Sequence, residues 1–430
     1  MNRMKDSGHE WLGLIPSHWS CDRIKNHFTL RNERNYDALE DVNLISLYTD
    51  KGVVQHQDLE KTTGNKAVTA DGYKKVYKGD IVVNIILCWM GAVGRSEYDG
   101  VTSPAYDIYM PAESINSKYY HYLFRTNNFN GECYRYGRGI MLMRWRTYSQ
   151  EFSSISIPVP PLEEQDRIVS LLDEKCGQVD QLIRNVEAQI EKLKAYKLAI
   201  ITEAVSKGLD STVSMKKSKV PYIGNIPAHW TIKRLKYVAD SFSKGSGITK
   251  EQVVENGDSS CVRYGEIYTK YNYYFSECVT RTNAELLTSP QYFMPGDVLF
   301  TCTGELVEEI GKSIAYLGNE PCLAGGDIVI MKHSQNSKFM GYALNSYYAQ
   351  EQKSRGKAKL KVVHTSASAL GNIYILLPPL DEQEMIANYL DGKCKSIDAL
   401  LSIKQKKINK LIQYRNTLIY EYVTGKKEVS

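Results

Sequence analysis

Residues 160–165 read PPLEEQ, and residues 378–383 read PPLDEQ. Proline suits the entrance of a helix because it has no N–H to lose there. The acidic residues that follow fall in the first helical turn, where the helix dipole favours negative charge. Beyond each hexapeptide, apolar residues recur at alternating spacings of four and three. The pattern predicts two long helices of similar length, at 160–209 and 378–430.

The apolar positions of the two predicted helices form narrow stripes. This spacing, kept over four heptads, indicates a coiled-coil seam, because a helix buried in a globular core needs a wider apolar face. The long link between the stripes leaves them free to pack together as an antiparallel coiled coil. Lys197 and Arg415 occupy equivalent seam positions, which we interpret as a place where the seam opens toward a partner. The predicted seam consists of Leu172, Cys176, Val179, Ile183, Val186, Ile190, Leu193, Leu390, Cys394, Ile397, Leu401, Ile408, Leu411 and Leu418.

The sequence around these helices occurs twice. The string WLGLIPSHW at 11–19 returns as YIGNIPAHW at 222–230, KGDIV at 78–82 returns as PGDVL at 295–299, and NSKY at 116–119 returns as NSKF at 336–339. The offset between copies varies by a few residues, as insertions in surface loops would produce. The repeated His-Trp pairs are interpreted as structural. Between the repeated blocks the two copies differ, so one framework carries two different surfaces.

Each copy begins with short β-rich runs, such as 81–87 and 297–301, bounded by Gly, Asp and Pro turns. We therefore predict an α+β fold with two β-rich α/β domains, at 1–159 and 210–377. The domains form a tandem pseudo-twofold repeat and are joined by the two helices of the coiled coil.

Composition limits the class of protein. With 43% hydrophobic and 24% charged residues in a chain of 430, the protein is expected to fold as roughly two or three domains. No apolar run approaches the ~20 residues of a membrane span, and the first residues lack a signal-peptide core. The nine cysteines form no C-x-x-C pair and the histidines no cluster, so we expect a cytoplasmic protein without a metal site.

Catalytic motifs are missing from the sequence. GELVEEIGKS at 304–313 resembles a phosphate-binding loop, but it has six residues between its glycines and Leu306 where the first glycine is needed. The Pro-Pro pairs resemble a methyltransferase motif, but Val159 and Leu377 replace its polar residue. We expect no catalytic residue and no cofactor in this chain.

Two basic segments precede the Pro-Pro boundaries. Residues 134–146 read YRYGRGIMLMRWR and residues 353–361 read KSRGKAKLK, and neither contains an acid. Basic side chains attract phosphates through counterion release, and arginine also reads guanine edges. We predict contacts with double-stranded DNA by Arg135, Tyr136, Arg138, Arg144, Arg146, Arg263, Lys353, Arg355, Lys357, Lys359 and Lys361.

The I-P-x-H-W entry, the Gly-Asp strand, the P-P-L-x-E-Q boundary and the long helix after it resemble the DNA specificity subunit of type I restriction–modification systems. The resemblance covers nearly the whole chain, twice. It implies that 1–159 and 210–377 are target-recognition domains that each read one part of a bipartite asymmetric DNA site. The helices at 160–209 and 378–430 would serve as spacers and as docking surfaces for two methyltransferase subunits.

The same resemblance implies that the chemistry belongs to partners. The methyltransferase subunits would bind S-adenosylmethionine, and restriction subunits would use ATP and Mg²⁺, so this chain would be a non-catalytic subunit. Two other functions remain open on the residues alone. One is a self-contained DNA methyltransferase or nuclease, and the other is a coiled-coil scaffold with no role on DNA.

Overall fold

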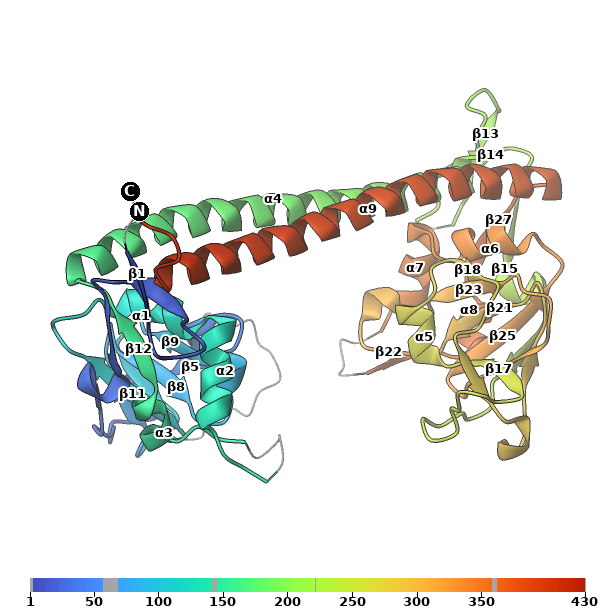
Figure 1. Ribbon diagram of the computed structural model, residues 1–430. Helices are drawn as coiled ribbons and strands as arrows, with labels where there is room; N and C mark the ends of the chain where they lie inside the picture. Colours follow the sequence, from blue (N-terminus) through green and yellow to red (C-terminus); the bar gives the residue numbers. More distant parts are fainter. Residues whose placement is uncertain (1–2, 57–68, 141–144, 221, 358–361, 430) are drawn as a thin grey trace. The chain divides into compact units, whose positions relative to one another are not determined.

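The computed structural model describes residues 3–56, 69–140, 145–220, 222–357 and 362–429. The chain forms two compact units: unit 1 comprises Met1–Glu187 with Lys406–Ser430, and unit 2 comprises Ala188–Gln405. Each unit combines a β-rich part with one half of each long helix, α4 (Leu162–Lys207) and α9 (Leu380–Val423). The predicted fold class is confirmed, since β-rich α/β folds occur in tandem and the two long helices pack together (Figure 1).

Unit 1 is built on an antiparallel sheet with strand order β4-β11-β8-β9. Its strands are β1 (Met4–Asp6), β2 (Leu14–Pro16), β3 (Ser20–Arg23), β4 (Phe28–Leu30), β5 (Ile45–Tyr48), β6 (Gly52–Gln55), β7 (Lys74–Val76), β8 (Ile81–Asn84), β9 (Val93–Arg95), β10 (Gly100–Thr102), β11 (Tyr106–Pro111) and β12 (Ser156–Val159). Its shorter helices are α1 (Ser117–Phe124), α2 (Asn127–Tyr136) and α3 (Ser149–Ser154).

Unit 2 repeats this sheet as β16-β25-β21-β23 and adds one strand, β18, parallel to β23. A second sheet has the order β19-β17-β24-β20. The strands are β13 (Met215–Lys217), β14 (Asn225–Pro227), β15 (Thr231–Arg234), β16 (Ala239–Lys244), β17 (Ser259–Val262), β18 (Tyr274–Phe275), β19 (Thr280–Thr282), β20 (Tyr292–Phe293), β21 (Val298–Thr301), β22 (Thr303–Gly304), β23 (Ser313–Tyr316), β24 (Cys322–Ala324), β25 (Ile328–His333), β26 (Val363–His364) and β27 (Tyr374–Leu377). The shorter helices are α5 (Tyr264–Thr269), α6 (Ser337–Ala343), α7 (Tyr347–Ser354) and α8 (Ala367–Gly371).

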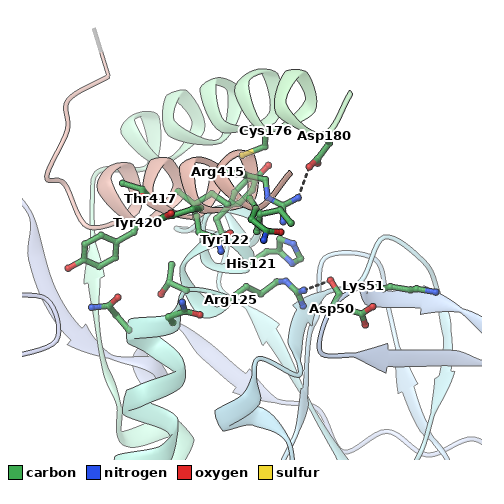
Figure 2. A pocket seen from close by; sticks show the side chains of 18 residues that line it. Asp50, Lys51, His121, Tyr122, Arg125, Cys176, Asp180, Arg415, Thr417 and Tyr420 are labelled. Carbon is green, nitrogen blue, oxygen red and sulfur yellow. Dashed lines mark hydrogen bonds and ion pairs between the residues drawn. The ribbon is translucent and has the colours of Figure 1, made fainter. Parts of the chain in front are cut away.

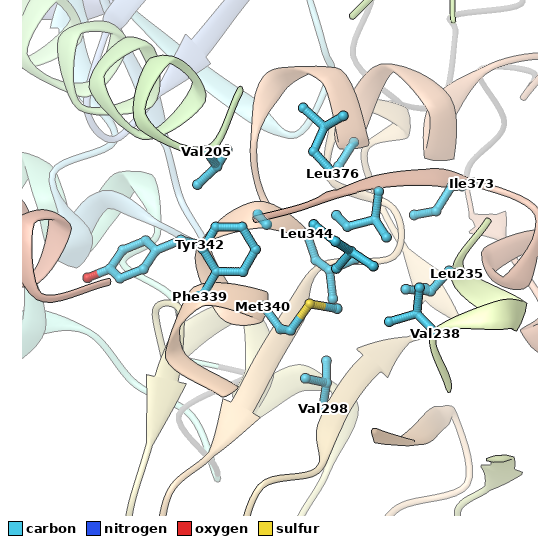
Figure 3. Packing of buried hydrophobic residues seen from close by; sticks show 14 of the residues in the cluster. Val205, Leu235, Val238, Val298, Phe339, Met340, Tyr342, Leu344, Ile373 and Leu376 are labelled. Carbon is cyan, nitrogen blue, oxygen red and sulfur yellow. The ribbon is translucent and has the colours of Figure 1, made fainter. Parts of the chain in front are cut away.

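The repeated Gly-Asp strand is buried on both faces in each unit. In β21, Val298 and Phe300 pack into the core below α6 and α4, while Leu299 between them packs into a second core on the opposite face. Side chains of a strand alternate between faces, so a strand covered on both sides is apolar throughout. Figure 3 shows the first of these cores, where Val298 of the sheet, Met340 of α6 and Val205 of α4 lie together.

The repeated His-Trp pairs attach the start of each copy to a long helix. Glu164, in the first turn of α4, accepts a hydrogen bond from Trp19 Nε1 at 3.0 Å, and its Oε2 lies 2.8 Å from His18 Nε2. Glu382 of α9 makes the same contacts with Trp230 at 3.0 Å and with the preceding histidine at 2.9 Å. These contacts explain why the two motifs recur together.

The glutamine of each P-P-L-x-E-Q motif joins the helix to the repeated Asn-Ser-Lys segment. Gln165 is fully buried; its amide oxygen accepts from the Asn116 backbone N–H at 2.8 Å, and its amide nitrogen donates to the Pro160 carbonyl at 2.8 Å. Gln383 accepts from the Asn336 backbone N–H at 3.0 Å and donates to the Pro378 carbonyl at 2.9 Å. The repeated motifs are therefore the parts of each unit that contact one another.

Within each unit the helices α4 and α9 run antiparallel, as predicted. In unit 2, Gln189 contacts Lys404 at 2.6 Å and Lys197 contacts Asp398 at 2.7 Å, so positions advance along α4 as they recede along α9. All the predicted seam residues are buried or half-buried. Leu182, outside the seam, is exposed, which agrees with a narrow stripe.

Each of the two basic seam residues forms an ion pair across the helices. Lys197 forms an ion pair with Asp398, and Arg415 forms the equivalent pair with Asp180 at 2.5 Å in unit 1. The interpretation of these positions as openings toward a partner stays a prediction, because the ion pairs do not test it. Over the described ranges, no helix carries an apolar stretch sufficient for a bilayer span.

Candidate nucleic-acid interface

The basic cluster of unit 1 begins in the last turn of α2 and continues into the residues that follow it. Arg138 and Arg146 exchange two backbone hydrogen bonds, of 2.9 and 3.0 Å, which close a loop. Gly137 is required at its entrance, because a Cβ there would collide with the indole of Trp145. Tyr134 stacks on the same indole with ring centroids 4.9 Å apart. These contacts hold Arg138 and Arg146 next to the end of α2.

Arg135 and Arg138 are exposed although each has a carboxylate neighbour. Their side chains are 60% and 68% exposed, and they contact Glu132 at 2.8 Å and Glu151 at 2.5 Å. The two carboxylates are only 9% and 16% exposed, so each pair joins a largely buried acid to a guanidinium whose outer side faces solvent and is available to a phosphate.

The other residues of this cluster are placed as follows. The Arg135 guanidinium lies 5.1 Å from the centre of the half-buried Tyr136 ring. Arg146 is half-buried, and Arg144 lies outside the described residues. Glu151 belongs to α3, which Figure 1 places at the end of unit 1 away from α4 and α9, so the cluster lies at that end.

Residues of the second basic segment, 353–361, differ in how far the folded structure buries them. Lys353 is 4% exposed, and its ammonium donates to the carbonyls of Gly311 at 2.8 Å and Leu344 at 2.7 Å. Burial lowers the pKa of Lys353 to about 7. The prediction that Lys353 contacts DNA is corrected, because its side chain points into unit 2.

Arg355 and Lys357 remain at the surface of unit 2, whereas Lys359 and Lys361 lie outside the described residues. The exposed Arg355 guanidinium lies 5.9 Å from the centre of the Tyr222 ring. Lys357 is half-buried and donates to the carbonyl of His364 at 2.5 Å. This segment is thus a weaker phosphate site than its composition indicates.

Arg263 lies in a cleft that the sequence reasoning did not identify. It precedes α5 and contacts Glu266 at 3.4 Å. The cleft has a volume of about 880 Å³, and Lys244 and Lys270 line it together with Arg263. Asp327 and Glu266 also line it, so its charge is mixed. The cations come from two separate segments of unit 2, since Arg263 and Lys270 flank α5 and Lys244 ends β16.

Glycines let the backbone segments of this cleft approach closely. A Cβ at Gly245 would collide with the carbonyl of Gly325, and a Cβ at Gly326 would lie 3.2 Å from Gly247 Cα. The strings KGSG at 244–247 and AGGD at 324–327 were the available sequence signal. β17, which directly precedes Arg263, lies on the side of unit 2 away from α9 (Figure 1).

The described residues contain no group of three or more His, Cys, Asp or Glu side chains that could hold a metal ion. The side chains that the structure places at both candidate surfaces include cationic, acidic and aromatic groups.

Comparison with known proteins identifies the family. Residues 25–194 and 227–413 both match the family described as "Type I restriction modification DNA specificity domain". The chain is 26% identical over 373 residues to the type I restriction enzyme MjaVIII specificity subunit of Methanocaldococcus jannaschii, covering 84% of this chain and 83% of that protein. It is 26% identical over 289 residues to the putative MjaX specificity subunit of the same organism, covering 65% and 61%.

A solved structure shares the fold. One chain of a structure described as showing complex assembly and conformational transition of the type I R-M system superposes with a TM-score of 0.66 at 16% identity, covering 95% of this chain and 98% of that one. The family match occurs twice and covers most of the sequence, once in each copy of the repeat. The chain therefore belongs to the type I restriction–modification DNA specificity family, whose members are the non-catalytic specificity subunits of these systems.

Proposed function

We propose that this chain reads a bipartite asymmetric site on double-stranded DNA and directs adenine methyltransferase and restriction subunits to that site. The β-rich part of each unit reads one half of the site. One observation carries the proposal: the two units repeat the same framework contacts, through Glu164 and Glu382, while their candidate surfaces differ. A duplicated framework with two unlike surfaces suits two unlike half-sites.

The length of the helices supports a fixed spacing between the half-sites. α4 has 46 residues, which corresponds to about 69 Å at ~1.5 Å per residue. B-DNA advances ~34–36 Å per turn, so this length matches about two turns of the duplex.

The chemistry in this proposal resides on partner subunits. Two methyltransferase subunits bind S-adenosylmethionine, and restriction subunits use ATP and Mg²⁺. This chain contributes DNA recognition and positioning, for which its two candidate surfaces supply cationic and aromatic side chains.

Exchange of one recognition segment tests the proposal. The chain is expressed with its methyltransferase subunit, and methylated adenines are mapped in cells that carry wild type or a chain with 210–377 replaced from another specificity subunit. The expected result is that one half of the methylated sequence changes and the other half stays. A change in both halves, or in neither, would overturn the proposal that each unit reads one half of the site.

Insertion of one heptad in both α4 and α9 tests the spacing. Seven residues add about 10 Å, equivalent to about three base pairs at ~3.4 Å each. The unread gap in the methylated site should lengthen by that amount. Methyl transfer or cleavage by the purified chain alone would instead favour a self-contained enzyme, and salt-insensitive DNA binding by the assembled complex would favour a scaffold.

A further inference from the structure

A tyrosine of unit 2 sits beside the helix seam. The ring of Tyr273 lies 4.7 Å from that of Tyr342 in α6, and the ammonium of Lys197 in α4 lies 5.0 Å from its centre. Lys197 at the same time pairs with Asp398 of α9. A half-buried aromatic ring is thus held between a second ring, tilted by 36°, and a seam cation, an arrangement stabilised by ring–ring contact and by cation–π attraction.

Unit 1 contains counterparts of the residues that surround Tyr273, but in the part of the chain that the structure describes it has no counterpart of Tyr273 itself. The residues around Tyr273 recur in the other copy of the repeat: Tyr342, Cys394, Asp398 and Lys197 correspond to Tyr122, Cys176, Asp180 and Arg415. All four counterparts line an open pocket of about 740 Å³ that lies wholly within unit 1. Figure 2 shows Tyr122, Arg415 and Asp180 around it. In unit 2, Tyr342, Cys394 and Asp398 also line a pocket, of about 610 Å³, but Tyr273 stands at its wall with its ring over the seam cation. The two units therefore differ in the ring over the seam cation, which unit 2 supplies by itself.

The backbone explains the difference. In unit 2 the Ala315 N–H donates to the Tyr273 carbonyl at 2.9 Å, and a Cβ at position 341 would collide with that carbonyl, so glycine stands there. In unit 1 the counterpart of Gly341 is His121, and its Nδ1 accepts from the Arg95 N–H at 3.1 Å. The imidazole of His121 thus accepts the hydrogen bond that the Tyr273 carbonyl, just before the extra strand, accepts in unit 2. An occupant of the pocket must enter as a side chain from solvent.

The seam cation of unit 1, which among the described residues has no counterpart of the Tyr273 ring over it, is more exposed than the seam cation of unit 2. The Lys197 side chain, which Tyr273 covers, is 11% exposed, whereas the Arg415 side chain is 32% exposed. A planar guanidinium stacks on aromatic faces better than an ammonium does. The segment 57–68, QDLEKTTGNKAV, contains no aromatic residue that could serve as the occupant.

We propose that this pocket of unit 1 receives an aromatic side chain, tyrosine in the first place, from the methyltransferase subunit. The inference rests on the proposed function. It favours a protein partner over a nucleobase because the pocket borders α9, whereas the arginine cluster of unit 1 lies at the opposite end, next to α3 (Figure 1). The two methyltransferase subunits then bind unequal sites, since unit 2 already supplies its own tyrosine.

Two matched variants test the inference. Arg415→Ala and Lys197→Ala each remove a seam cation and leave one aspartate on the facing helix without its partner. Purified methyltransferase subunit is titrated onto each full-length chain. Arg415→Ala should weaken one of the two binding steps by about 3- to 30-fold, the range of a cation–π contact. Lys197→Ala should change neither step by more than about 2-fold, because its ring belongs to the same chain.

A lysine at the same position gives a further check. Arg415→Lys reproduces the cation found in unit 2 and should recover most of the lost affinity. Equal effects of Arg415→Ala and Lys197→Ala on assembly would overturn the inference, because seam damage alone would then account for them.

The occupant is identified by photo-crosslinking in the assembled complex. A benzophenone amino acid at Gln413, on the pocket lining, should crosslink to a methyltransferase peptide that contains an aromatic residue. Alanine at that residue should weaken assembly as much as Arg415→Ala, and the two changes together should add nothing further. Crosslinks confined to this chain, to a second copy of it or to DNA would overturn the inference.

Failure of the inference differs from failure of the proposed function. If the wild-type chain does not assemble with the methyltransferase subunit or direct methylation, both are overturned. If it does both and the two cation variants behave alike, the pocket assignment alone falls.

Discussion

Replacing Arg135 and Arg138 together by glutamine should reduce the salt dependence of DNA binding. Both side chains are more than half exposed at the end of unit 1 next to α3, and the outer side of each guanidinium is available to phosphate. Each phosphate that a protein neutralises adds about 0.9 to the slope of log affinity against log salt concentration. The double variant should therefore lose up to about 1.8 in slope.

The size of the effect follows from that slope. Between about 50 and about 200 mM salt, a slope difference of ~1.8 changes the ratio of wild-type to variant affinity by about 12-fold. Fluorescence anisotropy of the full-length chain, assembled with methyltransferase subunit, on a random-sequence duplex measures it. No knowledge of the target is needed, because this contribution is independent of sequence.

Lys353→Met is the matched control, since it removes a cation from the other basic segment but from a buried position. Its plot should run parallel to that of wild type. A double arginine variant whose plot also runs parallel to wild type would refute the assignment of the unit 1 loop to the phosphate backbone.

Three further outcomes are expected, each measured by urea unfolding. Burial lowers the pKa of Lys353 from 10.5 to about 7, so between these pH values the unfolded chain binds one more proton than the folded chain. Over that range the free energy of unfolding of wild type should rise with pH relative to that of Lys353→Met, by at most ~1.4 kcal/mol per pH unit. Parallel pH profiles of the two proteins would contradict this. Burial lowers the pKa of His121 from 6.5 to about 3, so its contribution to the free energy of unfolding is fully present above pH 6.5 and is lost as the pH falls toward 3. His121→Asn keeps an acceptor for the Arg95 N–H and should lessen that loss. An acid profile like that of wild type would count against this prediction. Glu164→Ala should lower the free energy of unfolding by about 1–3 kcal/mol, because it leaves the buried indole N–H of Trp19 without an acceptor. Glu164→Gln keeps an acceptor and should lower it less. Equal effects of the two variants would show that the hydrogen bond is unimportant.

The framework was predictable because it depends on local chemistry repeated in the chain. Pro160 and Pro161 mark the helix entrance, and α4 begins at Leu162 directly after them. The spacing of Leu172 and its successors requires a partner stripe, and the second copy supplies one of equal length. Periodicity of this kind constrains a helix pair strongly, since each turn repeats the same requirement.

The candidate surfaces were less predictable because composition does not give the direction of a side chain. Lys353 stands in a run without acids, yet the phase of α7 turns it toward Gly311 and Leu344. Lys244 and Arg263 share a cleft because two sheets bring together segments that no local pattern connects.

The sequence by itself determined that the chain is a duplicated framework with two long paired helices, because repeats and heptads are local patterns that each carry their own structural requirement. Tertiary structure alone decided which cations face solvent and which part of the seam stays open. The contrast between Lys197, which has the Tyr273 ring over it in unit 2, and Arg415, which borders an open pocket in unit 1, depends on an extra strand and on His121 standing where the other copy has glycine. Such differences arise from packing between distant segments, where one side chain excludes another from the same space.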